Sequence, residues 1–99
     1  MFNFDSFLRS ELGALSGTER GKVYEDKLRA YWDTVNESDD LAIIQGITDF
    51  ARFDMLTVLA LLGSELDESQ AVDEQLQMEM ALDRLAIIRG REVKKTIWN

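Results

Sequence analysis

The chain contains no proline among its 99 residues, so almost nothing in it forces a helix to end. Its apolar residues recur at intervals of three and four, which is the period of an amphipathic helix. The most apolar segment of this kind runs from Ser38 to Gly63, and another runs from Glu68 to Trp98. We therefore predict an all-α fold built on a long antiparallel helical hairpin, over about 38–63 and 68–97.

Two shorter helices are predicted before the hairpin. The first covers about residues 3–15, and the second runs from the Ser-Gly-Thr-Glu break at 16–19 to about Val35. Apolar residues at helical spacing mark one face of the second helix: Tyr24, Leu28, Tyr31 and Val35. About four helices would thus form a small helical bundle, and residues 1–99 would form a single helical domain.

Each predicted helix has polar residues at its start that are suited to capping free backbone N–H groups. In chain order the candidates are Asn3 or Asp5, then Ser16 with Glu19 or Thr18, then Ser38, then Asp67 with Gln70. Gly63 is suited to the C-terminal end of the third helix. These signals place the hairpin turn at residues 63–67.

A six-residue motif occurs twice, as LAIIQG at 41–46 and LAIIRG at 85–90. In an antiparallel hairpin whose turn is centred between residues 65 and 66, these two segments lie side by side. Each contains a pair of small residues four positions apart, Ala42 with Gly46 and Ala86 with Gly90. Small residues let helix backbones approach closely, so we predict a helix crossing at these four positions. The alternative is a coincidence among residues that are common in helices.

The second half of the segment 38–63 is apolar on nearly every side. Met55 continues the apolar stripe of this helix, and Leu56 and Leu59 add further apolar side chains beyond that stripe. Such a helix is either central to the core or covered by a second subunit. We therefore take these three residues as candidates for an interface.

The residue types exclude several kinds of chemistry. With no cysteine and no histidine, the chain cannot form disulfides, use thiol or imidazole catalysis, or build the usual zinc sites. The carboxylates lie at helix starts or on polar faces, and the sequence has no phosphate-binding glycine loop. We predict a protein that is not an enzyme and that binds no cofactor or metal.

Charge is unevenly distributed along the chain, whose net charge is −8. The segment 37–83 contains twelve acidic residues and one basic residue, whereas 84–99 contains five basic residues and one acidic residue. An acidic middle and a basic end favour head-to-tail contact between copies. The candidate interface residues of the basic end are Arg89, Arg91, Lys94, Lys95 and Trp98. Trp98 has the alternative role of closing the end of the core.

Other partners are not expected. The overall acidity would repel nucleic-acid phosphates at long range, and the basic residues of the last helix spread around it rather than lining one side. The N-terminal residues do not resemble a signal peptide, and no apolar run is long enough to span a bilayer. Together with the lack of cysteine, these features predict a cytoplasmic location, or a virion if the protein is phage-encoded.

The last helix carries the pattern Leu-x-x-x-Arg-Gly-Arg, then six intervening residues and a Trp, formed by Leu85, Arg89, Gly90, Arg91 and Trp98. In this pattern the segment 76–98 resembles the C-terminal helix of small helical proteins encoded by tailed bacteriophages. The resemblance implies either a virion or head-assembly component, or a small acidic host-takeover factor such as a CRISPR inhibitor.

The sequence therefore favours a non-enzymatic protein–protein interaction module that self-associates. Its expected partner is a second copy of the chain, or another phage or host protein. The alternative is a small acidic inhibitor of a host protein that imitates nucleic acid. The mass of the protein in solution separates these two interpretations.

Overall fold

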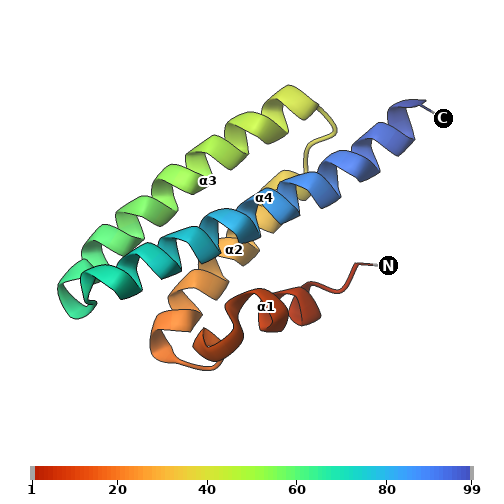
Figure 1. The fold of residues 1–99 in the computed structure, drawn as a ribbon. Helices are drawn as coiled ribbons and strands as arrows, with labels where there is room; N and C mark the ends of the chain where they lie inside the picture. Colours follow the sequence, from red (N-terminus) through yellow and green to blue (C-terminus); the bar gives the residue numbers. More distant parts are fainter. Residues whose placement is uncertain (1, 99) are drawn as a thin grey trace.

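The computed structural model describes residues 2–98, and the side chains of residues 2–95. Every regular element in this part of the chain is helical, which confirms the all-α prediction (Figure 1). In chain order the elements are α1 (Phe4–Leu12), the short 3-10 helix η1 (Gly13–Leu15), α2 (Glu19–Asn36), α3 (Leu41–Leu62), the 3-10 helix η2 (Gly63–Glu65) and α4 (Glu68–Trp98).

The α3 and α4 helices form the predicted antiparallel hairpin, and η2 joins them at one end (Figure 1). The α2 helix packs against both arms and runs parallel to α4. Its first turn lies beside Glu74, and its last turn lies beside Arg89. The α1 helix runs back along α2, where Arg29 forms an ion pair with Asp5. The hairpin thus forms one layer, and the first two helices cover one of its two faces.

Three of the predicted caps are confirmed. The side chain of Asn3 accepts a hydrogen bond from the Ser6 N–H (3.0 Å). Thr18 does the same for Gly21 (2.9 Å). Asp67 accepts from the Gln70 N–H at 2.8 Å, as in a capping box. Each satisfies an N–H group that has no partner within its helix.

The predicted cap of the third helix is wrong by two residues. Asp40, not Ser38, accepts hydrogen bonds from the Ala42 and Ile43 N–H groups, at 2.8 and 3.4 Å. The local sequence offers several capping residues in a row, and the first of them, Ser38, takes part in a distant contact. Arg89 of α4 binds the backbone oxygen of Ser38 at 2.9 Å, which holds this residue in the connection before the helix.

The core lies where α2 crosses the inner face of the hairpin. All four residues of the predicted α2 stripe are buried there, with exposed fractions of 4% or less. They pack with buried apolar residues from the other helices, which include Leu8, Leu12, Met55, Leu59, Met78, Leu82 and Leu85. The helical period therefore predicted the inner face of α2 correctly.

The hairpin register is confirmed, but the predicted close crossing of small residues is wrong. A Cβ atom at Gly90 would lie 3.9 Å from Leu41 Cδ2, so positions 41 and 90 are neighbours as expected. Ala42 and Gly46, however, are exposed, and a Cβ atom at Gly46 would find no atom within 4 Å. A helix turns about 100° per residue, so Ala42 and Leu41 point in different directions, and only Leu41 faces α4.

Candidate interaction surface

The outer face of the hairpin, which points away from α2, exposes large apolar side chains. We call this surface the hairpin outer face. It consists of Phe53, Leu56, Val72, Leu76, Met80 and Ile87. The exposed fractions of these side chains range from 39% for Leu56 to 68% for Phe53. None of them belongs to the buried core.

Helical spacing explains how α4 presents this face. Val72, Leu76, Met80 and Ile87 are separated by four, four and seven residues, so they line one side of the helix. The core side of the same helix carries Met78, Leu82 and Leu85, each with an exposed fraction of 0%. The α4 helix is therefore apolar on two sides, and only one of them is buried in the core.

An ion pair joins the two helices across the hairpin outer face. Arg52 of α3 donates a hydrogen bond to the Asp83 carboxylate of α4, and Asp83 lies between Met80 and Ile87 in sequence. Arg52 in turn lies next to Phe53. The exposed apolar side chains thus lie on two adjacent helices that this ion pair joins.

A hollow of about 350 Å³ opens between the start of α3 and the second half of α4. It is lined by Leu41, Ile44, Gln45, Ala86, Ile87, Gly90, Arg91 and Lys94. The missing side chain of Gly90 leaves space for it, because the nearest atom to a Cβ at this position would be 3.9 Å away. Ile87 belongs both to this hollow and to the hairpin outer face.

The structure separates the three apolar interface candidates of α3. Leu56 is exposed and lies on the hairpin outer face. Met55 and Leu59 are buried, with exposed fractions of 3% and 7%, so their prediction as interface residues is wrong. Both lie in the core that forms beneath the first two helices. In a helix that is apolar all round, periodicity cannot tell which side the rest of the chain will cover.

The basic end of α4 also divides into two groups. Arg89 is used within the chain, in contrast to its predicted place at an interface. Its guanidinium donates to the backbone oxygens of Val35 (3.4 Å), Asn36 (3.3 Å) and Ser38 (2.9 Å). It also pairs with the Asp39 carboxylate at 2.9 Å. Arg89 thus satisfies carbonyl groups at the end of α2, which has no basic residue in its own last turn.

The other basic candidates remain exposed. Arg91, Lys94 and Lys95 face solvent, and none of them takes part in an ion pair within the described side chains. The side chain of Trp98 lies outside the described residues. The basic surface available to a partner is therefore the last part of α4, beyond Gly90.

A buried polar network joins α2 to α4. Glu74, which is 6% exposed, accepts a hydrogen bond from the Tyr24 hydroxyl at 2.7 Å and from Arg20 Nε at 2.9 Å. Glu74 is a charged residue on a helix face that is otherwise apolar. This position in the sequence is the signal from which its burial in a polar network could have been predicted. The network satisfies each buried partner, and no buried side-chain polar atom among the described residues lacks a hydrogen bond.

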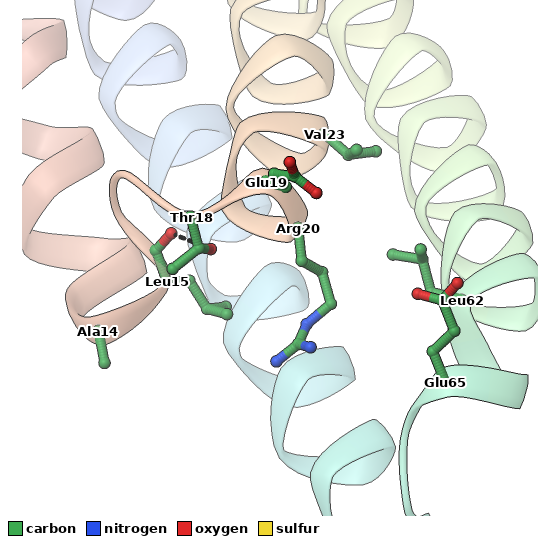
Figure 2. A pocket seen from close by; sticks show the side chains of 8 residues that line it. All are labelled: Ala14, Leu15, Thr18, Glu19, Arg20, Val23, Leu62 and Glu65. Carbon is green, nitrogen blue, oxygen red and sulfur yellow. Dashed lines mark hydrogen bonds between the residues drawn. The ribbon is translucent and has the colours of Figure 1, made fainter.

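A hollow of about 580 Å³ lies beside this network (Figure 2). Figure 2 shows Arg20 projecting between the η1 connection and the opposite wall, which Leu62 and Glu65 form. The Thr18 hydroxyl donates to the Leu15 carbonyl oxygen at 2.7 Å and closes the turn. The charged groups at this hollow are the Arg20 guanidinium, already bound to Glu74, and the exposed carboxylates of Glu19 and Glu65.

An apolar groove of about 550 Å³ lies on the surface between α2 and α3. Phe50 and Ile43 form its exposed edge, with exposed fractions of 73% and 54%, and Gly46 leaves it open. The Lys27–Asp54 ion pair, 2.9 Å long, lines the groove. Because the predicted place of Gly46 is at the α4 contact, this groove was not predicted.

These features define a small helical bundle whose hairpin exposes large apolar side chains. Within the described residues, no cluster of three or more acidic side chains is placed to hold a metal ion, and no helix is long and apolar enough to cross a membrane. Comparison with protein families, curated proteins and solved structures finds no match to this chain.

The two buried tyrosines predict a loss of stability at alkaline pH. Burial raises the pKa of both Tyr24 and Tyr31 above the usual 10.0, and for Tyr24 the hydrogen bond and charge of Glu74 raise it further. Above about pH 10 the unfolded chain therefore loses protons that the folded chain keeps, so the free energy of unfolding falls as pH rises. For each tyrosine the slope is at most about 1.4 kcal/mol per pH unit.

Urea unfolding between pH 9 and pH 11 measures this slope, with the pH range chosen to bracket the usual tyrosine pKa. The Tyr24→Phe variant is the control, because it removes one of the two titrating groups. Its slope should be roughly half that of the wild type. A stability that stays constant across this range would contradict the assignment of both tyrosines as neutral and buried.

Proposed function

We propose that the chain is a non-enzymatic protein–protein interaction module that self-associates through the hairpin outer face. The observation that supports this proposal is the set of six large, exposed apolar side chains on two adjacent helices. Contiguous apolar patches of this kind on a soluble domain are typical of protein–protein contact sites.

The fold itself gives no reason for these residues to be apolar. Leu76 and Val72 are exposed by 56% and 59%, and neither belongs to the core cluster. A polar residue at either position would leave the contacts among α1, α2 and the hairpin intact. Burial against a second chain, by contrast, would remove this apolar area from water, at roughly 25 cal/mol per Å².

The Leu76→Glu variant tests the proposal directly. The wild-type protein is expected to be a dimer or higher oligomer at roughly 100 µM, and the variant should be mainly monomeric, with a dissociation constant raised about 100-fold or more. Sedimentation equilibrium or light scattering with mass determination measures both. Leu76 is exposed in the single chain, so the helix content of the variant should not change.

Leu61→Glu is the matched control. Leu61 is also a leucine on the hairpin, and it is 76% exposed, but it is not part of the hairpin outer face. Its replacement should leave the mass of the oligomer unchanged. A wild-type chain that remains monomeric at every concentration would overturn the proposal.

A monomer would instead favour the second candidate, a small acidic inhibitor of a host protein. The observation in its favour is that exposed carboxylates, including Asp49 and Asp73, border the same apolar face. The resemblance of the segment 76–98 to phage proteins is compatible with both candidates. In the first case the module would belong to a virion or to head assembly.

A further inference from the structure

We propose that the hairpin outer face binds a second copy of this chain in an antiparallel arrangement with two-fold symmetry. In this arrangement Asp73 of each copy faces Arg91 of the other, and each copy places Leu76 over the hollow beside the other's Gly90. The inference rests on the proposed function, and it specifies the partner and its orientation.

The order of charges along α4 supplies the first argument. Asp73 and Arg91 are both exposed, and neither is in an ion pair within the described side chains. They are 18 residues apart, which is five helical turns, so they lie on the same side of α4 with about 27 Å between them. Leu76, Met80 and Ile87 lie between them on the exposed side of the helix. The helix thus presents an acidic end, an apolar centre and a basic end.

This order selects an antiparallel pair of α4 helices. In a parallel pair, Asp73 of one chain would face Asp73 of the other, and Arg91 would face Arg91. Like charges would then repel each other at both ends of the contact. In an antiparallel pair whose facing positions sum to about 164, Asp73 of each copy faces Arg91 of the other, and Leu76 faces Ile87. Both ends then attract, and the apolar centres meet.

The hollow beside Gly90 supplies the second argument. A glycine inside a helix costs about 1 kcal/mol relative to alanine, so it usually has a packing reason. The single chain provides no such reason, because a Cβ at Gly90 would meet only Leu41 Cδ2, at 3.9 Å. In the antiparallel pair the hollow formed by Ile87, Gly90 and Arg91 lies opposite Val72 and Leu76 of the second copy. The glycine therefore makes room for a partner's side chain.

The ion pair at the centre of the surface can be buried without leaving either of its two charges unpaired. Arg52 and Asp83 are already bound to one another in each chain. The hairpin outer face is also large enough. The 22 residues of α3 span about 33 Å, and two adjacent helices are about 20 Å wide, so the footprint approaches the ~800 Å² per partner of a standard interface.

Charge reversal at the two ends tests the orientation. Asp73→Lys and Arg91→Glu are each expected to weaken the dimer about tenfold or more, because each change introduces repulsion at two symmetry-related contacts. The double variant D73K/R91E exchanges the charges and should restore the wild-type dissociation constant. Asp33→Lys, an exposed change of the same size on α2, should have little effect.

Filling the hollow tests the packing. Gly90→Leu should weaken the dimer at least tenfold, while the helix content of the monomer and its thermal stability stay the same or rise. The mass of the wild-type assembly should stop at two chains, since a two-fold contact closes on itself. Growth beyond two chains would indicate head-to-tail contact and would overturn the inference.

The failures of the two proposals are distinguishable. If Leu76→Glu dissociates the oligomer but the single charge reversals do not weaken it, the surface is correct and the antiparallel orientation is wrong. If the double variant D73K/R91E binds itself no more tightly than the single variants do, the antiparallel orientation is also wrong. If the wild-type chain does not self-associate at all, the proposed function itself fails.

Discussion

Replacement of Glu74 by leucine is expected to lower the free energy of unfolding by about 2–4 kcal/mol. Glu74 is buried and joins α4 to α2 through Tyr24 and Arg20, at 2.7 and 2.9 Å. Without the carboxylate, the fully buried Tyr24 hydroxyl has no acceptor. The Arg20 side chain is 33% exposed and can regain contact with water, which limits the loss.

Two further variants separate the parts of this effect. Glu74→Gln keeps an oxygen that can accept from Tyr24, so it should lose only about 1–2 kcal/mol. Combining Glu74→Leu with Tyr24→Phe removes both buried partners, and the double variant should be more stable than the sum of its single changes predicts. Urea unfolding at neutral pH measures all of them. A Glu74→Leu variant as stable as the wild type would show that the network contributes nothing.

The Gly21→Ala variant is expected to destabilise the protein by about 2–4 kcal/mol, although alanine is the better helix former. A Cβ atom at Gly21 would lie 1.7 Å from the Leu15 carbonyl oxygen and 2.6 Å from its carbon. These are backbone atoms, so the connection between η1 and α2 would have to move. That movement would also disturb the Thr18 cap, whose hydroxyl accepts from the Gly21 N–H.

Gly46→Ala is the matched control for this prediction. Gly46 is also a helical glycine, but a Cβ there would find no atom within 4 Å. This variant should be about 1 kcal/mol more stable than the wild type, as helix propensity alone predicts. The two alanine variants thus have opposite expected signs, which thermal or urea unfolding reads directly. A stabilising Gly21→Ala would contradict the close approach to Leu15.

Local chemistry explains why much of the fold could be predicted. The stripe from Tyr24 to Val35 is buried as its spacing requires, since a helix with one apolar side has only one way to face a core. The caps at Asn3, Thr18 and Asp67 are correct because each bond joins residues only three positions apart. The turn that follows α3 is likewise set by local signals.

The candidate site was harder to predict, because it depends on distant contacts. Arg89 looked like an exposed base, but it is bound to the connection between α2 and α3, some fifty positions away in sequence. Gly46 and Gly90 occur in nearly identical motifs, yet only Gly90 faces the other arm of the hairpin. No local pattern distinguishes the two glycines.

The sequence by itself determined the helices, their order and the register of the hairpin, because helix period, capping and turns depend on residues a few positions apart. The tertiary structure alone decided which apolar residues became surface. Met55 and Leu59 are buried while Leu56 is exposed, although all three are apolar neighbours on one helix. The two helices that precede the hairpin can cover only one of its two faces, and the face they leave open is the hairpin outer face.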